Sequence, residues 1–342
     1  MNEEVMQKEI SRILDEPSDW QEKIRRLQRL LSRASDLVGP ESEASILIAQ
    51  NIEELLDKNR TVGLSTGLAD LDRVVGGIKS GHCYVLAANT GMGKSLLALN
   101  ILVNLAKDGT HTVYFDLENG IEPTLERILR IWYALPEEFF KSEDNKEEIK
   151  RMAAGVANLD YYNIESLHHS RLDTLEVILS KMETHVEEDH TKLFVVDPLQ
   201  ALEKEARGEQ QAYIQIGSVI RQLKDAAQEM KTAVLICHHL RKGQISGGSW
   251  VEVLDSVDPV KYRFPTLDDI KGTSKITDYA TDVWGLIRQN AASTPEERAK
   301  TCLRILKQRT GVEGDIRLIF REDVLTYNSA APANEVFDGG VG

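Results

Sequence analysis

Residues 88–95, Ala-Asn-Thr-Gly-Met-Gly-Lys-Ser, combine small residues with a lysine and a hydroxyl side chain at a spacing suited to holding phosphate. The segment lies between an apolar run, Cys83 to Ala87, and a helix-like stretch, Leu96 to Ala106. In such a strand–loop–helix context, backbone N–H groups and the helix N-terminus converge on the phosphates of a nucleotide. The sequence therefore predicts a phosphate-binding loop for a nucleoside triphosphate.

The loop has two side chains with specific expected roles. Lys94 is expected to reach the β- and γ-phosphates, and the Ser95 hydroxyl to ligate Mg²⁺. The first position of the G-x₄-G-K-S pattern is Ala88 instead of glycine, but the two glycines nearest the phosphates are present. We expect ATP or another nucleoside triphosphate, with Mg²⁺, as cofactors. The expected binding residues are Ala88, Asn89, Thr90, Gly91, Met92, Gly93, Lys94 and Ser95.

Carboxylates follow two further apolar runs. Leu193 to Val196 leads into Asp197, and the run that ends at Phe115 leads into Asp116 and Glu118. Ligands of open α/β sheets bind at the carboxyl ends of the strands, so Asp197 is expected to hold Mg²⁺ together with the loop serine. Glu118 is our choice for the base that polarises the attacking water, with Asp116 the alternative. Alternatively, Asp197 is a turn-forming residue at the end of a buried strand, and Asp116 and Glu118 are solvated strand-end charges.

Two histidines, His238 and His239, follow the apolar run Ala233 to Cys237. Adjacent residues of a strand point to opposite faces, so this pair alone is not expected to form a mononuclear metal site. A polar side chain here could instead contact the γ-phosphate and report its loss to the loop that follows.

That loop mixes cations with glycines, which suits contact with a nucleic-acid phosphate backbone, although a solvated basic loop is an equally good interpretation. Its residues are Arg241, Lys242, Lys261, Arg263, Lys271 and Lys275, with Gly243, Gly247, Gly248 and Gly272.

A third basic group is Lys307-Gln308-Arg309. In a strand, Lys307 and Arg309 point to the same face at the tip of an expected hairpin. A planar guanidinium at that place could stabilise transition-state charge as an arginine finger in a neighbouring subunit. That role requires an oligomer.

These residues need a scaffold that gathers strand ends, and the chain predicts one. Apolar strands alternate with helical stretches, which indicates an α/β fold with a mostly parallel central sheet and helices on both faces. A C-terminal antiparallel hairpin is expected to extend the sheet. The expected strands are Cys83–Ala87, Thr112–Phe115, Leu193–Val196, Ala233–Cys237 and Val283–Ile287, followed by the hairpin strands Thr301–Lys307 and Asp315–Phe320.

The chain divides into three expected parts. Residues 1–60 carry three amphipathic helical stripes, interpreted as a helical region or linker that serves either as a cap on the main domain or as an oligomerisation arm. Residues 61–328 form the expected ATPase domain, and residues 329–342 a flexible tail. Within the domain, residues 244–268 show no clear periodicity and are expected to form a long loop.

The 342 residues are 42% apolar and 28% charged, as in ordinary globular proteins, and the net charge is −14. An acidic balance excludes a surface that coats nucleic acid everywhere, but it permits a locally basic channel. No apolar run is long enough to span a membrane and the N-terminus lacks a signal-peptide pattern, so we expect a cytoplasmic or nucleoid-associated protein, or a host-cytoplasmic one if viral. The three cysteines are expected to be buried.

Taken in order, seven segments resemble the RecA-like motor domain of DnaB-type ring helicases, including their phage and mitochondrial primase-helicase branch. The resemblance covers about residues 62–327. Its segments are Gly63–Asp72, the phosphate loop, Phe115–Glu118, Asp197–Gln200, His239-Leu240, Asp269–Ser274 and Lys307–Gly314.

The resemblance implies a RecA-like P-loop fold and a hexameric ring with nucleotide sites between subunits. Glu118 would be the catalytic base, His239 the γ-phosphate sensor, and Arg309 with Lys307 the finger acting on the neighbour. The DNA-binding residues would be Arg241, Lys242, Lys271, Gly272 and Lys275.

The implied function is that of a replicative helicase that translocates on single-stranded DNA, 5′ to 3′ by family likeness, and unwinds duplex DNA at a replication fork. Its implied partners are single-stranded DNA, further copies of the chain, and a primase, loader or polymerase, with no membrane. Two alternatives share the phosphate loop and the sheet: a RecA-like filament-forming recombinase and a DNA-binding regulatory ATPase.

Overall fold

The computed structural model describes residues 12, 13, 23 and 26, then residues 63–330 with short gaps at 158–161, 168–173, 204–208, 241–249, 252–261, 264, 271–272, 290–291, 293 and 309–313. Apart from those first four residues, the expected helical region 1–60 lies outside the described residues, as does nearly all of the expected tail 329–342. The chain separates into two compact units, and the larger one contains Leu64–Gln308 together with the strands that follow Val312.

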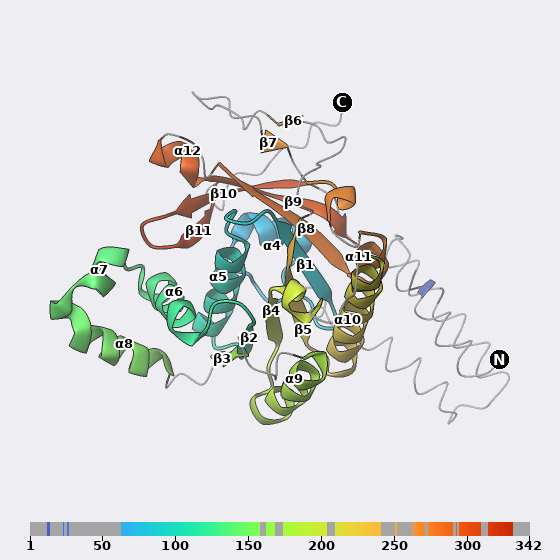
Figure 1. Cartoon of the computed structure of the whole chain (residues 1–342), viewed down its shortest axis with the longest axis horizontal. Helices are drawn as coiled ribbons and strands as arrows, with labels where there is room; N and C mark the ends of the chain where they lie inside the picture. The colour runs from blue at the N-terminus through green and yellow to red at the C-terminus, as the bar shows by residue number, and fades with distance from the viewer. Residues whose placement is uncertain are drawn as a thin grey trace. The chain divides into compact units, whose positions relative to one another are not determined.

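A nine-stranded mixed sheet forms the centre of this larger unit, in the order β11-β10-β9-β8-β1-β5-β4-β2-β3 (Figure 1). Strands β8, β1, β5, β4, β2 and β3 run parallel, whereas β9, β10 and β11 extend the sheet in antiparallel fashion. The strands are β1 Cys83–Ala88, β2 Thr112–Asp116, β3 Tyr162–Ser166, β4 Leu193–Asp197, β5 Ala233–His239, β8 Asp282–Arg288, β9 Lys300–Gln308, β10 Asp315–Arg321 and β11 Thr326–Ser329.

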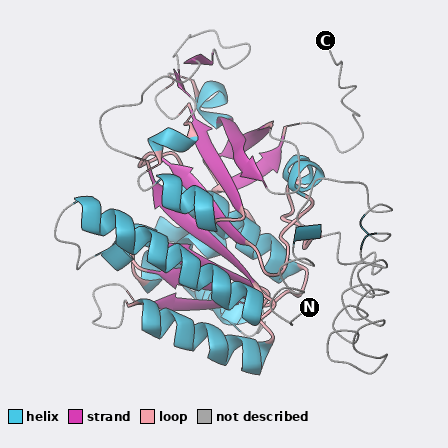
Figure 2. Cartoon of the chain, turned by 90° about the vertical axis from the view of Figure 1, so that its right-hand side faces the viewer, coloured by secondary structure: helices cyan, strands magenta, loops and turns pink. Residues whose placement is uncertain are grey.

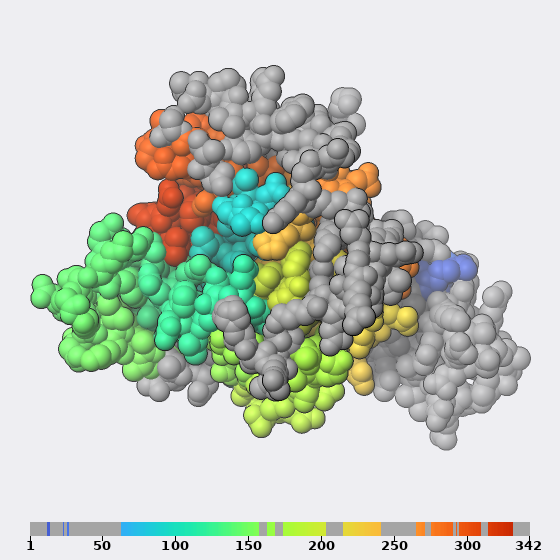
Figure 3. All heavy atoms as spheres, viewed as in Figure 1, coloured from blue at the N-terminus to red at the C-terminus, as the bar shows by residue number. Residues whose placement is uncertain are grey.

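Helices cover both faces of the sheet, as Figure 2 shows in a side view. Their bounds are α4 Ala69–Val75, α5 Lys94–Lys107, α6 Ile121–Tyr133, α7 Glu137–Lys141, α8 Lys146–Ala157, α9 Leu175–Asp189, α10 Glu209–Glu229, α11 Thr273–Tyr279 and α12 Pro295–Ala299, with 3₁₀ turns η1 Glu143–Asn145, η2 Leu199–Glu203 and η3 Leu267–Asp269. Segment α6–α8 forms the lobe at the left of Figures 1 and 3. Among the described residues, none of the helices has the length and apolar character needed to cross a membrane.

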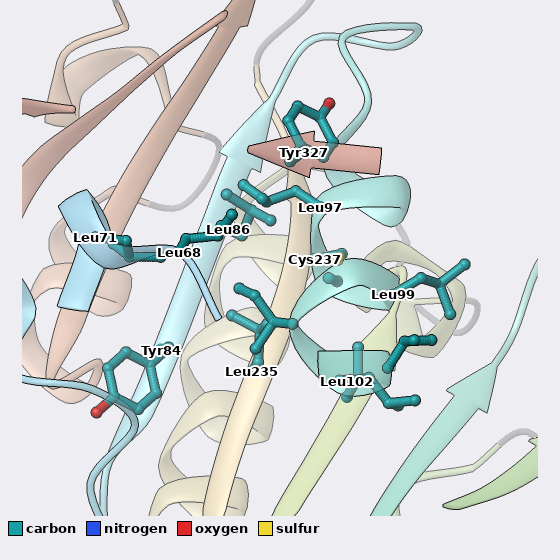
Figure 4. Close-up of a cluster of buried hydrophobic side chains, with 14 of the residues drawn as sticks. Leu68, Leu71, Tyr84, Leu86, Leu97, Leu99, Leu102, Leu235, Cys237 and Tyr327 are labelled. Atoms are coloured by element: carbon teal, nitrogen blue, oxygen red, sulfur yellow. The ribbon is translucent and has the colours of Figure 1, made fainter. Parts of the chain in front are cut away.

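The alternation of side chains along each strand explains why the central strands are apolar throughout. In β1, Tyr84 and Leu86 point into a core shared with α4, α5 and α6, whereas Cys83 and Val85 point into a second core shared with α9, α10 and α11. Figure 4 shows the first core, in which leucines of α5 pack onto β1 and β5. Because both faces are buried, neither tolerates polar residues, and the strand reads as a continuous apolar run.

The predicted α/β architecture is confirmed, including the parallel centre and the antiparallel C-terminal strands. Two edge strands were not predicted, β3 and β11. Strand β3, Tyr-Asn-Ile-Glu-Ser, is an edge strand that pairs only with β2. Three of its five residues are polar, so its apolar signal is weak. Strand β11, Thr-Tyr-Asn-Ser, is four residues long with a single apolar side chain, Tyr327, in the core.

The expected structureless loop 244–268 is corrected in part. Two short strands, β6 Trp250–Val251 and β7 Tyr262–Arg263, pair in antiparallel register, and η3 begins within the same stretch. Two-residue strands give no alternation that sequence reading could detect. Residues 244–249, 252–261 and 264 of this loop lie outside the described residues.

The turn Ser65-Thr66-Gly67, before α4, is held to α4 and α5 at the start of the domain. Asp72 accepts hydrogen bonds from Thr66 N at 2.9 Å, Thr66 Oγ1 at 2.7 Å and Ser65 Oγ at 2.7 Å. Gly67 has a φ of +76°, and a Cβ there would meet the Asn104 amide of α5 at 2.3 Å. The contact between this turn and α5 therefore requires glycine.

Replacing Asp72 with alanine should lower the free energy of unfolding by about 1–3 kcal/mol, because it leaves the Thr66 N–H without its acceptor. Chemical denaturation monitored by circular dichroism measures this loss. Arg73→Ala in the same helix is the control, since its pair with Asp70 is an i,i+3 surface contact expected to contribute below about 0.5 kcal/mol. Equal losses in the two variants would contradict the assigned role of Asp72.

Candidate nucleotide-binding site

The loop 88–95 has the backbone geometry of an anion cradle. Gly91 and Gly93 take φ values of +81° and +93°, which other residues rarely adopt. Gly93 is the N-cap of α5, and no side chain caps this helix end, whose first turn carries no acidic residue. The first N–H groups of α5 and the positive end of its dipole are therefore available to an anion.

The departure at Ala88 is explained by its position. Ala88 is the last residue of β1, is fully buried, and does not have a positive φ. Its neighbour in the parallel register is His239, and its carbonyl accepts a hydrogen bond from Leu240 N at 3.3 Å. Because the backbone is extended here, a methyl group is accommodated and glycine is not required.

Lys94 and His239 meet at the carboxyl ends of β1 and β5. Lys94 Nζ lies 3.3 Å from both ring nitrogens of His239, and the lysine is 6% exposed. The preceding residue, His238, is fully buried and lies on the other side, with Nδ1 2.8 Å from Gln200 Nε2. The prediction that the two imidazoles face opposite ways is confirmed.

Asp197, the predicted Mg²⁺ ligand, has a buried carboxylate. Tyr114 donates a hydrogen bond of 2.5 Å to Asp197 Oδ2, and burial together with this carboxylate raises the pKa of Tyr114 well above its ordinary value. The second oxygen, Oδ1, is buried without a hydrogen-bond partner among the described residues. Such a carboxylate oxygen on the strand beside β5 fits a cation that needs one protein carboxylate plus phosphate oxygens and water.

Asp116 and Glu118, the two candidates for the base, differ sharply. Asp116 is fully buried and accepts hydrogen bonds from Glu118 N, Asn119 N and Thr124 Oγ1 at 3.1, 2.8 and 2.5 Å. Its oxygens hold the turn that leads into α6. Glu118 is exposed and lines the same pocket as the phosphate loop. The geometry favours Glu118 for proton abstraction and assigns Asp116 a structural role.

One pocket of about 600 Å³ unites most of these groups. The phosphate loop and the start of α5 contribute Asn89, Thr90, Gly91, Gly93, Lys94, Ser95 and Leu96. The segment from the end of β2 through α6 contributes Glu118, Asn119, Pro123, Glu126, Arg127 and Arg130, and the other lining residues are Glu137, His239, Arg288 and Leu325. The pocket therefore brings together the phosphate loop, the candidate base and the candidate sensor.

Sequence reading missed two residues of this site. Arg288, the last residue of β8, donates from Nη2 to the Gly91 carbonyl at 3.3 Å, and its guanidinium carbon lies 4.5 Å from the Phe320 ring centre. Tyr327 donates from its hydroxyl to the Gly93 carbonyl at 3.3 Å. Because β8 runs parallel to β1, the strand-end rule that selected Asp197 could also have selected Arg288.

Among the described residues, the predicted Ala88, Met92, Asp197, Lys275 and Lys307 do not line this pocket. Lys307 donates from Nζ to the carbonyls of Thr277 and, at 2.6 Å, Ala280, so it caps the end of α11 within its own chain. The stem of Lys275 packs against Gly217 of α10. Arg309 and the predicted DNA-binding residues Arg241, Lys242, Lys271 and Gly272 lie outside the described residues. The roles of all these residues stay predictions.

The mostly parallel sheet, the phosphate loop after β1 and the carboxylate at the end of β4, two strands away, define a P-loop nucleotide-binding protein of the RecA-like class. The family model described as "DnaB-like helicase C terminal domain" matches residues 63–329. The chain therefore belongs to the family of DnaB-like helicase C-terminal domains.

Curated relatives agree with this assignment. "Replicative DNA helicase DnaC" of Bacillus subtilis is 24% identical over 295 residues, covering 84% of this chain and 61% of the relative. "Replicative DNA helicase DnaB" of Geobacillus stearothermophilus is 25% identical over 304 residues, with the same two coverages of 84% and 61%. The chain thus spans about three fifths of the length of these relatives.

Two solved structures share the fold. The "ATPase Domain of G40P" superposes with a TM-score of 0.67 at 21% identity, covering 85% of this chain and 99% of that one. A DnaB-like replicative helicase, described with its interactions with primase, superposes with a TM-score of 0.66 at 20% identity, covering 90% of this chain and 76% of that one.

The contrast between the two carboxylates predicts opposite phenotypes. Asp116→Ala should lower the free energy of unfolding by about 2 kcal/mol or more, because it removes the acceptor of three hydrogen bonds. Glu118→Gln should change it by less than about 0.5 kcal/mol, because the side chain is exposed. Chemical denaturation of both variants measures the two free energies of unfolding. A clear loss of stability in Glu118→Gln would contradict the assignment of the structural role to Asp116 alone.

Proposed function

We propose that this chain is the motor part of an ATP-hydrolysing replicative DNA helicase. The observation that carries the proposal is the shared pocket, in which Lys94, His239 and Glu118 surround the N-terminus of α5. Membership of the DnaB-like family supports the same conclusion. On this proposal hydrolysis moves the protein along single-stranded DNA, 5′ to 3′ by likeness to its family, and separates duplex DNA.

ATP, or another nucleoside triphosphate, with Mg²⁺ would supply the phosphoryl group whose transfer to water releases energy. The glycines and the first turn of α5 would bind its phosphates through backbone N–H groups, and Lys94 would balance their charge. Ser95 and Asp197 would hold the metal, the latter through the oxygen that lacks a partner in the described residues. Arg288 keeps the loop in shape from the side through the Gly91 carbonyl.

Glu118 would take a proton from the attacking water, because it is an exposed carboxylate of the pocket two residues after β2 and the β2–α6 turn holds its backbone. His239 would sense the γ-phosphate, because Lys94 and His239 reach the same point and a phosphate placed there would contact both. Leu240, the next residue, forms a β-bridge with Ile270. A change at His239 would therefore be passed directly to the segment 271–275, which is proposed to contact DNA.

The proposed assembly is a hexameric ring in which Arg309, and Lys307 in a rearranged position, reach a neighbour's nucleotide. Arg241, Lys242, Lys271, Gly272 and Lys275 are proposed to face DNA in the central channel. Primase, a loader or a polymerase are proposed partners; one structural neighbour is described with primase. The proposed location is the cytoplasm or nucleoid. Open filaments on single-stranded DNA seen by electron microscopy would favour a recombinase instead.

Lys94→Ala should reduce DNA-stimulated ATP hydrolysis by about 100-fold or more, because the variant loses the cation that neutralises the phosphates. Phosphate release with forked DNA, together with strand separation of the same substrate, measures the effect. Lys107→Ala is the matched control, since Lys107 ends the same helix about 20 Å away. Unwinding that persisted in Lys94→Ala would overturn the proposal.

Arg309→Ala should abolish hydrolysis while leaving nucleotide affinity within about twofold, because a finger acts on the transition state in the next subunit. Rings mixed from unaltered and variant chains should lose more activity than their composition predicts. Titration of variant into unaltered protein, with Arg317→Ala of the exposed face of β10 as control, tests this. Activity that followed simple averaging would exclude a role between subunits.

A further inference from the structure

Arg130, in the third turn of α6, is a buried charge whose hydrogen bonding is incomplete. Its side chain is 9% exposed. Nη2 donates to the Asp323 carbonyl at 3.1 Å, whereas Nη1 lies 3.8 Å from Glu126 Oε1 and 3.9 Å from Glu137 Oε2. Its Nε is buried without a partner among the described residues. Burying a guanidinium with a single short hydrogen bond is costly, so its position calls for an explanation.

The helix that carries Arg130, α6, is attached to the turn that carries the candidate base Glu118. Arg130 belongs to the helix that begins at Ile121, directly after the turn that carries Glu118. Asp116 ties that turn to the first turn of α6 by accepting hydrogen bonds from Glu118 N and Thr124 Oγ1. A displacement of α6 would therefore move the backbone of Glu118.

The turn that accepts the hydrogen bond from Arg130 is attached to the phosphate loop. Asp323 lies in the turn between β10 and β11, which approaches α6 and α7 in Figure 1. In the same turn, the Leu325 carbonyl accepts a hydrogen bond of 2.9 Å from Asn100 Nδ2 of α5. Two residues later, Tyr327 N donates to Asn100 Oδ1, and the Tyr327 hydroxyl donates to the Gly93 carbonyl. This turn is thus fixed to the phosphate loop and to α5.

We infer that Arg130 is a positioning residue that holds the Glu118 side of the nucleotide pocket at a set distance from the phosphate-loop side. The inference rests on the proposed ATPase function. Arg130 spans the gap between two rigid parts, α6 and the β10–β11 turn, through one charge-assisted hydrogen bond to a backbone carbonyl. Its residence at the edge of the pocket agrees with this role, since it lines the pocket together with Glu137.

The kinetic consequence follows from which groups bind and which react. On the proposed function, most of the nucleotide affinity would come from the loop amides and Lys94, which lie from the end of β1 to the start of α5 and not on α6. The attack of water depends on the position of Glu118, and a shift of about 1 Å in a catalytic group can cost as much as 100-fold in rate. Loss of Arg130 should therefore act on kcat and spare KM.

The first test compares Arg130→Met, which keeps the length of the side chain but removes its donors, with Arg130→Lys in the full chain. We expect kcat for ATP with single-stranded DNA to fall about tenfold in Arg130→Met, with KM within about twofold. Arg130→Lys should recover part of the loss. Asp323→Ala is the control, because it keeps the carbonyl that accepts from Arg130 and removes only the pair with Arg321; it should keep kcat.

The second test is a double-mutant cycle with Glu118→Gln, followed by single-turnover hydrolysis. If Arg130 acts through Glu118, Arg130→Met should change the rate less than about twofold once Glu118 is already replaced. A purely structural role predicts a lower melting temperature with independent, multiplicative effects on rate. Should Arg130→Met melt below the assay temperature, the same cycle is run with Arg130→Lys.

The outcomes separate this inference from the function on which it rests. Unaltered protein that fails to hydrolyse ATP rejects the proposed function and the inference with it. Unaltered protein that hydrolyses ATP, combined with an unchanged kcat or a raised KM in Arg130→Met, rejects the inference alone. Multiplicative effects in the cycle reject it as well. A kcat loss that vanishes in the Glu118→Gln background supports it.

Discussion

The parallel pairing of β1 with its two neighbours is the constraint on which the site depends. Strands β5 and β8 flank β1 in register, and all three end at the same edge of the sheet. Parallel strands put their carboxyl ends together, so the loop after Ala88, the imidazole of His239 and the guanidinium of Arg288 meet without any being near another in sequence. Each side chain serves the site because a buried strand ends where it does.

Two buried carboxylates at this edge of the sheet, Asp116 and Asp197, have different hydrogen-bond partners. Asp116 has its oxygens occupied by the turn that it organises, which leaves it no capacity for chemistry. Asp197 has one oxygen bound by Tyr114 and the other without a partner in the described part of the chain. Buried polar atoms are normally satisfied, so the difference between the two aspartates supports the proposal that Asp197 is the metal ligand.

Much of this arrangement could be predicted from the sequence. The fully buried strands and the phosphate loop produce strong local signals, because burial on both faces forces apolar runs and glycines mark positive φ. The strand-end residues Asp197 and His239 give weak signals by themselves and gain weight only beside the phosphate loop. What could not be predicted depends on contacts across long sequence separations. Tyr327 reaches Gly93, and Lys307 reaches the end of α11 within its own chain. The edge strands β3 and β11 also escape detection, since half-exposed strands have mixed composition.

The contact between Tyr327 and Gly93 has a consequence for how the protein is made. A Cβ at position 93 would lie 2.3 Å from the Tyr327 hydroxyl, so the phosphate loop is fitted closely around a residue from the last strand. During synthesis, Gly93 is incorporated 234 residues before Tyr327. A nascent chain therefore carries the phosphate-binding motif long before it has the finished site. The contact that packs the phosphate loop against Tyr327 forms only when β11 joins the sheet, so the loop reaches its final surroundings only once the last strand is in place.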